Sequence, residues 1–200
     1  MKPFITAAAT IVAALFLSSC TSPASDGHTD HAHDSESSAA VASASPAPNN
    51  AADLTFVTGM IPHHEQAVQM SALVAQRSTN PSVTTLAADI SAAQGPEIQT
   101  MKALLAQWGG DAHSSGHQGH EGMEMQGMVD DSTMAKLASL NGADFDQLWL
   151  QSMIGHHEGA IAMARTEIAD GANADAKTLA TQIVTAQQAE IGQMKQMLGG

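Results

Sequence analysis

Aromatic and basic side chains are scarce in this sequence. The chain has no Tyr and only four Phe and two Trp, so its core must come largely from aliphatic side chains and the 12 Met. Seven Lys and Arg against 20 Asp and Glu give a formal net charge of -13. We therefore expect no nucleic-acid partner, because the phosphates would be repelled. Abundant Ala and short β-branched runs favour helices over sheet.

The single cysteine lies where it predicts lipidation. Residues 1–19 contain Lys2 and the apolar run FITAAATIVAALFL, which is too short to span a membrane as a mature helix and is typical of a signal peptide. The run ends in LSSC, which resembles a bacterial lipoprotein box with cleavage before Cys20. We expect an exported protein whose lipidated Cys20 anchors it to the outer face of the cytoplasmic membrane or to another envelope membrane.

The segment after the cysteine predicts a tether. Residues 20–50 are rich in Ser, Ala, Pro and Asp, and such a segment cannot bury enough apolar surface to order itself. Within it, DGHTDHAHD carries His28, His31 and His33. These histidines could bind Cu(II) or Zn(II) weakly or have no role in metal binding, and the pattern does not separate the two readings.

Residues 51–200 contain one pattern twice. MIPHHEQAVQM starts at Met60 and MIGHHEGAIAM at Met153, an offset of 153 − 60 = 93 residues. A second segment of each half matches at the same offset without a gap, which indicates a duplicated unit. In that segment the first half has Ile90, Gln94, Glu97, Ile98, Met101, Lys102 and Leu105, and the second has Ile183, Gln187, Glu190, Ile191, Met194, Lys195 and Leu198.

Each half reads as a helical hairpin. Apolar residues recur at spacings of three and four, and STNPS, WGG, NG and DGAN supply the breaks. We predict an all-α, four-helix bundle made from two duplicated hairpins, with a kink at Gly95-Pro96. The expected helices span about 53–77, 82–108, 132–140, 143–169 and 174–198, which gives a first hairpin at 51–108, a His/Met-rich loop at 109–131 and a second hairpin at 132–200.

The inward stripes of the hairpins carry candidate metal ligands. On the first helix of each hairpin a His shares the stripe with Met, and the adjacent His is rotated by about 100° toward the helix interface. On the second helix a Glu and a Met lie on the stripe, so a closed bundle would bring imidazoles, thioethers and carboxylates together. Alternatively, the His and Glu are ordinary buried polar pairs and Met fills the core. The candidates are Met60, His63, His64, Met70, Glu97, Met101, Met153, His156, His157, Met163, Glu190 and Met194.

The segment between the hairpins, DAHSSGHQGHEGMEMQGMVDD at 111–131, carries further candidates. It has no Lys or Arg, and its Gly and Ser predict a flexible loop that has no need of Met for a core. Thioethers with imidazoles suit Cu(I), and MEMQGM resembles the methionine motifs of bacterial copper- and silver-handling proteins. The alternative is a flexible polar loop with no metal role. The candidates are His113, His117, His120, Met123, Met125 and Met128.

Together these motifs resemble a known family. MIPHHEQAVQM and FDQLWLQSMIGHHEGAIAMA, followed by QGPEI and QQAEI, resemble the domain-of-unknown-function family 305 over about residues 51–199. The resemblance implies a ferritin-like four-helix architecture. It also implies an exported bacterial protein from a family in which some members are implicated in binding copper and catalysis is not established.

We therefore expect a lipid-anchored protein that binds copper, with zinc or iron less expected, and that buffers copper or delivers it to a copper-handling partner. One alternative is a ferritin-like dinuclear oxidase or peroxidase. Such sites usually need four carboxylates and two Glu-x-x-His motifs, whereas this chain has Gln-x-x-Glu twice. A second alternative is a metal-free interaction module whose histidines sense pH, which leaves the Met-rich loop unexplained.

Overall fold

The computed structural model describes residues 48–110 and 126–199, in which every regular element is a helix and none is a strand. The predicted all-α class is confirmed, and the long helices end within two residues of the predicted positions. The predicted signal peptide, Cys20, the tether histidines and the loop residues up to Met125 lie outside the described residues. The helices are α1 (Ala51–Arg77), α2 (Pro81–Gln107), α3 (Asp131–Ser139), α4 (Gly142–Asp170) and α5 (Ala174–Met197).

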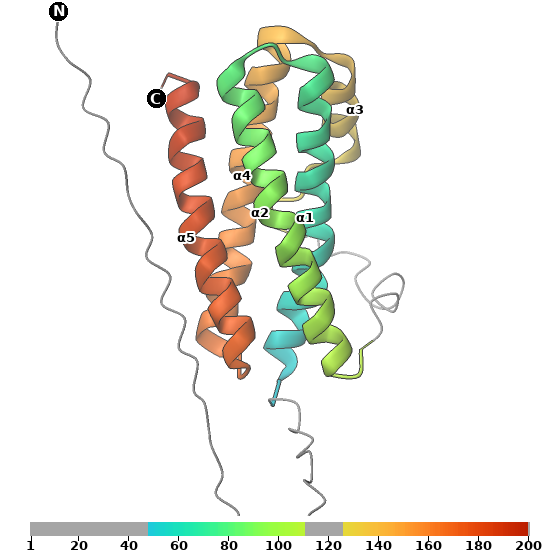
Figure 1. Ribbon diagram of the computed structural model, residues 1–200, viewed down its shortest axis with the longest axis vertical. Helices are drawn as coiled ribbons and strands as arrows, with labels where there is room; N and C mark the ends of the chain where they lie inside the picture. The colour runs from blue at the N-terminus through green and yellow to red at the C-terminus, as the bar shows by residue number, and fades with distance from the viewer. Residues whose placement is uncertain (1–47, 111–125, 200) are drawn as a thin grey trace, which may run out of the picture. The chain divides into compact units, whose positions relative to one another are not determined.

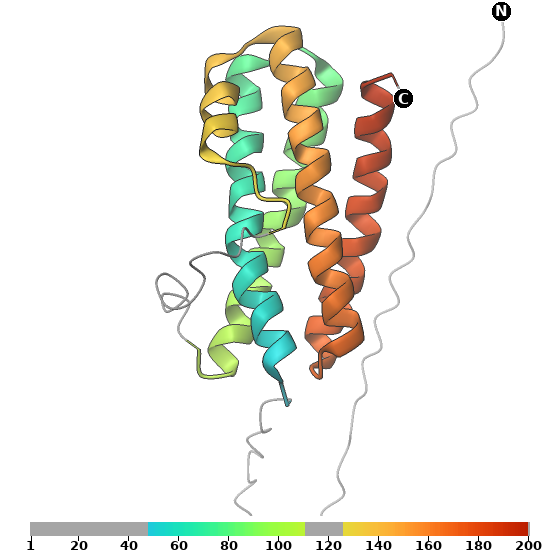
Figure 2. The ribbon, with the colours of Figure 1, turned by 180° about the vertical axis from the view of Figure 1, so that it is seen from behind.

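Four long helices form the bundle and the short α3 lies beside it (Figures 1 and 2). α1 and α2 form one antiparallel hairpin, and α4 and α5 form the other. The hairpins meet mainly where α1 packs against α4, and these two helices run in opposite directions. α2 and α5 approach each other less closely. Within the described ranges, none of the helices combines the length and the apolar character needed to cross a membrane.

Asparagine side chains begin three of the long helices. The Asn50 side chain accepts hydrogen bonds from the backbone N–H groups of Ala52 and Asp53, and Asp53 accepts from the Asn50 N–H, which completes a capping box. Asn80 caps α2 with Pro81 in the first helical position, and Asn173 caps α5. These local signals explain why the helix starts were readable from the sequence.

Two prolines lie inside the long helices. α2 continues from Pro81 to Gln107 through Gly95-Pro96, and the kink expected there stays a prediction. α1 also contains an internal proline, Pro62, which the pattern had not singled out. Each ring removes one backbone donor from its helix, so packing must compensate for the lost bond. Pro62 immediately precedes the paired histidines of α1.

The core consists mainly of aliphatic side chains, with methionines and a few aromatic residues, in two clusters. Phe145 and Trp149 of α4 are fully buried in one cluster, and Phe56 of α1 is buried in the other. The Trp149 indole Nε1–H donates to the Met70 carbonyl oxygen at 3.0 Å, which ties α4 to α1 inside the core. Complete burial of a large apolar side chain such as Phe145 stabilises the fold by roughly 1.5–3 kcal/mol. The α1–α4 contact is thereby fixed in register, and this register positions the central histidines.

Candidate metal centre

His63 and His156 meet at the middle of the bundle. His63 lies midway along α1 and His156 midway along α4, and their ring centroids are 3.7 Å apart with the planes inclined by 37°. Both side chains are buried. The sequence placed both on the inward stripe, and the antiparallel contact of α1 with α4 brings the two stripes together.

Burial keeps both central imidazoles neutral. Desolvation, reinforced by neighbouring histidines, lowers the pKa of His63 to about 3 and that of His156 to about 2. His63 Nε2 lies 3.2 Å from the Gln126 carbonyl oxygen. Among the described residues, His63 Nδ1 has no hydrogen-bond partner, and the His156 ring has only a weak polar contact with the backbone of His63. Unpaired nitrogens of neutral imidazoles are the atoms that bind metal ions.

The second histidine of each pair binds a carboxylate through Nε2, and its Nδ1 has no partner in the described part of the chain. His64 Nε2 is 2.8 Å from Glu97 Oε2, and His157 Nε2 is 2.6 Å from Glu190 Oε2. Both histidines are buried, whereas the Glu97 and Glu190 side chains are 19% and 14% exposed. Each carboxylate therefore lies nearer the surface of the bundle and binds the second histidine, His64 or His157, of its own hairpin. The sequence had placed these carboxylates on the inward stripe with His63 and His156.

The six candidate methionines fall into two groups of three. One group belongs to each core cluster, and each combines two methionines of one hairpin with one of the other. Because α1 and α4 are antiparallel, the groups lie on opposite sides of the His63–His156 pair along the bundle axis. All are buried except Met163, which is half-buried. The first group is Met60, Met101 and Met163, and the second is Met70, Met153 and Met194.

Within the described residues, carboxylates do not surround the central histidine pair. In the ranges 48–110 and 126–199, no three His, Cys, Asp or Glu side chains converge in a way that could hold a metal ion. The described part instead has two neutral imidazoles with methionines on either side along the bundle axis, and imidazole and thioether are ligand types that suit Cu(I) or Ag(I). Of the predicted loop ligands, only Met128 is described, and it is half-buried.

Two buried glutamines, which are not among the ligands predicted from the sequence, have side-chain amides that are unpaired within the described ranges. Gln94 of α2 and Gln187 of α5 are buried, and all four of their side-chain amide atoms lack a partner in the described part of the chain. Buried amide groups are usually satisfied, so each position is suited to an ordered water molecule or another polar group. The only sequence signal was their place in the repeated Gln-x-x-Glu pattern.

A buried carboxyl pair lies at the end of the bundle where α1 begins. The Asp53 carboxylate accepts hydrogen bonds from the backbone N–H groups of Asn50 (2.6 Å), Ala172 (3.1 Å) and Asn173 (2.9 Å). Burial acts to raise the pKa of Asp53, but these hydrogen bonds outweigh it and lower that pKa. Burial, together with the interaction with Asp53, raises the pKa of Glu167 to about 8. Glu167 is therefore largely protonated at neutral pH.

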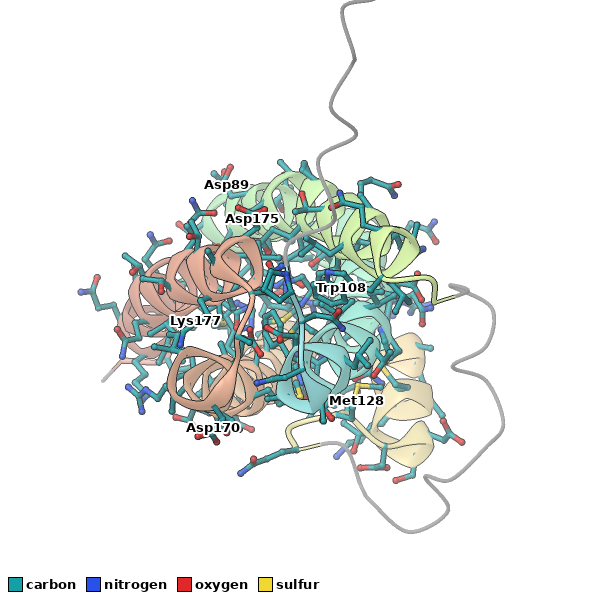
Figure 3. The ribbon with its side chains drawn as sticks, turned by 90° about the horizontal axis from the view of Figure 1, so that it is seen from below. Asp89, Trp108, Met128, Asp170, Asp175 and Lys177 are labelled. Carbon is teal, nitrogen blue, oxygen red and sulfur yellow. The ribbon has the colours of Figure 1, made fainter. Side chains whose placement is uncertain are left out.

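The surroundings of this pair include the turn from α4 to α5. Asp170 and Lys177 mark that turn in Figure 3, which looks onto this end of the bundle. Lys177 Nζ donates to the Gly171 carbonyl oxygen at 3.1 Å, and the Asn50 side chain donates to the Asp170 carbonyl oxygen at 2.8 Å. The pair thus joins the start of α1 to the α4–α5 turn, away from the central histidines.

This fold and site define a helical-bundle protein with a buried histidine pair flanked by methionines. The chain belongs to the family described as Domain of unknown function (DUF305), whose sequence model matches residues 53–198. A DUF305 protein from Streptomyces coelicolor, classed as a candidate secreted protein, is 33% identical with a TM-score of 0.68, over 74% of this chain and 92% of that one. A DUF305 fragment from Deinococcus radiodurans has the same identity and TM-score, over 76% and 98%.

Structures of a protein named CopM also match. CopM in its Cu(II)-bound form is 33% identical with a TM-score of 0.61, over 72% of this chain and 94% of that one. Its Cu(I)-bound and Ag-bound forms match with TM-scores of 0.58. An uncharacterised protein of Acanthamoeba polyphaga mimivirus is 40% identical over 53 residues, and the match spans 26% of this chain and 35% of that protein.

Proposed function

We propose that this chain is an exported, lipid-anchored protein that binds copper and buffers it or delivers it to a partner outside the cytoplasmic membrane. The observation that carries the proposal is the central pair of His63 and His156, with ring centroids 3.7 Å apart. Their free nitrogens and the flanking methionines suit a soft ion. The similarity to CopM, whose structures hold Cu(I), Cu(II) and Ag, supports copper as the ion.

The donor chemistry fits Cu(I) better than zinc or iron. A ferric or zinc centre draws on carboxylates and imidazoles. Glu97 and Glu190 each bind the second histidine of a pair, His64 or His157, and not the central histidines. Thioether sulfur adds no charge, so a Cu(I) ion held by methionine and neutral histidine would bring only one positive charge into the core. Each group of three methionines with the nearer central imidazole would make one candidate site.

The segments outside the bundle would place the protein at the membrane and capture copper. Lipidation at Cys20 would hold the protein at the membrane, residues 20–50 would give it reach, and the loop at 109–131 would capture the ion. The bundle would then retain copper away from water. The similarity to the candidate secreted protein from Streptomyces coelicolor supports export.

The test is an anaerobic Cu(I) competition titration of the full chain and three variants. His63→Ala combined with His156→Ala, and Met60→Leu combined with Met153→Leu, should each weaken Cu(I) binding by about tenfold or more, the equivalent of about 1.4 kcal/mol. Leu replaces Met with little change in packing, so the second variant isolates the loss of sulfur. Met197→Leu is the matched control, because Met197 is a partly buried methionine outside both groups of three.

Thermal melts of each variant accompany the titrations. The methionine variant should melt within a few degrees of the parent, whereas the histidine variant should also lose stability because two buried rings are removed. Unchanged Cu(I) affinity in both ligand variants, with melts showing that they are folded, would remove the bundle from the proposal. Equal weakening in the Met197→Leu control would show that the effect is not specific to the site.

A further inference from the structure

The segment that leads into α3 is fastened to α1. Residues 126–129, here called the strap, cross the face formed by α1 and α4 (Figure 2). Gln66 Nε2 donates to the Val129 carbonyl oxygen at 2.7 Å, and the Val129 N–H donates to Gln66 Oε1 at 2.8 Å. The side chain of Gln66 therefore pairs with the strap as a neighbouring backbone would, and this fixes the strap along α1.

The strap also lies directly on the backbone of α4. A Cβ atom added to Gly159 would come within 2.0 Å of the Gln126 carbonyl oxygen and 2.6 Å of Gly127 Cα. A Cβ atom at Gly127, whose φ is +88°, would lie 2.8 Å from the Gly155 carbonyl oxygen. Only glycine at both places allows this approach. The Gln66 side chain of α1 therefore binds one side of the strap, and Gly159 of α4, which has no side chain, makes room for the other side.

The strap makes the two halves of the bundle unequal. Gln66 and Gly159 occupy matched positions, since 159 − 66 = 93, yet one binds the strap and the other makes room for it. The central histidines also occupy matched positions, but the Gln126 carbonyl oxygen lies 3.2 Å from a ring nitrogen of His63 alone. No hydrogen bond joins His156 to the strap, and the polar contact of its ring is with the backbone of His63. The strap therefore forms a hydrogen bond with one ring of the repeated pair and not with the other.

A hydrogen bond to a carbonyl fixes the tautomer of a neutral imidazole. The Gln126 oxygen can only accept, so Nε2 of His63 must carry the hydrogen, and only Nδ1 keeps a lone pair. The strap does not restrict the tautomer of His156 in this way, because its carbonyl contact is with His63. In metalloproteins a second hydrogen bond of this kind commonly fixes which nitrogen of a histidine binds the metal.

We propose that Gln66 and Gly159 are positioning residues, which hold the strap so that His63 is fixed as the Nε2–H tautomer and His156 is the imidazole that an incoming soft metal ion binds first. The assignment of metal as the ligand rests on the proposed function. The positioning of His63 does not, because it concerns the metal-free chain.

The test uses the full chain with ¹⁵N-labelled histidine. In the metal-free parent, long-range ¹H–¹⁵N spectra should show His63 as a single Nε2–H tautomer. Gln66→Met and Gly159→Ala should release it into a mixture of tautomers and speed amide exchange of Val129 by about tenfold or more, since hydrogen bonds to the strap are lost. Gln69→Met, at an exposed position of α1, and Gly155→Ala, where an added Cβ meets open space, are the matched controls and should leave both readouts unchanged.

Titration with Ag(I), a redox-stable stand-in for Cu(I), supplies the second readout. The ring signals of His156 should shift before those of His63 in the parent, and the order should be lost when the strap is released. A His63 tautomer that is unchanged in both strap variants, or His63 shifting first in the parent, would overturn the proposal. If Ag(I) moved no imidazole signal, the proposed binding function would fail, while a fixed tautomer released by the variants would still confirm the strap's positioning role.

Discussion

Replacing Glu167 by Gln should stabilise the protein at alkaline pH. Glu167 is 1% exposed, and burial beside Asp53 raises its pKa from 4.5 to about 8. An unfolded chain releases this proton near pH 4.5, whereas the folded chain keeps it until about pH 8. Folding therefore takes up a proton between these values, so the contribution of Glu167 to stability is complete below about pH 4.5 and is lost as the pH rises toward 8.

The size of the effect follows from the pKa difference. One pKa unit corresponds to about 1.36 kcal/mol, so between pH 5 and pH 8 the parent should lose roughly 3 kcal/mol relative to the Glu167→Gln variant. His63 and His156 act in the opposite direction, since their folded pKa values of about 3 and 2 lie below 6.5 and favour folding as the pH rises. The difference between parent and variant isolates Glu167, because both chains share these histidines.

Urea unfolding of both chains at several pH values between about 5 and 8.5 measures this difference. The two should be similarly stable near pH 5, where Gln resembles the protonated acid, and should diverge steadily until about pH 8. Glu158→Gln is the control, because it makes the same change on α4 at a side chain that is 58% exposed. A difference between parent and Glu167→Gln that does not vary with pH would refute the reasoning, as would an equal divergence for Glu158→Gln.

Three further predictions concern parts of the chain that the sequence singled out. Changing Met123, Met125 and Met128 to Leu should weaken Cu(I) binding in a competition titration with little change in melting temperature, and parent-like affinity would exclude them as ligands. A chain lacking residues 1–50 should give a helical circular dichroism spectrum and a single cooperative melt; substantial sheet would contradict this. Cys20→Ser should abolish incorporation of a labelled fatty acid, and a mutant that is still labelled would disprove the anchor.

The sequence was sufficient for the helices because their signals are local. Apolar residues at helical spacing and the breaks between them mark the long helices without reference to the rest of the chain. In the structure, Asn50, Asn80 and Asn173 cap three of these helices. The inward placement of His63 and His156 followed from the same periodicity. It needed only the assumption that the repeated stripes face each other.

Contacts that depend on how helices are packed could not be predicted. That Glu97 faces His64 rather than His63 depends on the register of α2 against α1. The matched position of Glu167 is Val74, since 167 − 93 = 74, so the repeat gave no sign that a buried acid would lie there. Gln66 contacts a backbone 63 residues away, and no local pattern encodes such a contact.

The most direct test of the account is copper X-ray absorption on a chain whose loop can no longer bind the metal. With one equivalent of Cu(I), we expect copper to be retained in the bundle with both imidazole nitrogen and thioether sulfur as its ligands. A shell of nitrogen and oxygen alone, or copper that is lost from this chain but kept by the parent, would contradict it. The loop changes are His113, His117 and His120 to Gln and Met123, Met125 and Met128 to Leu.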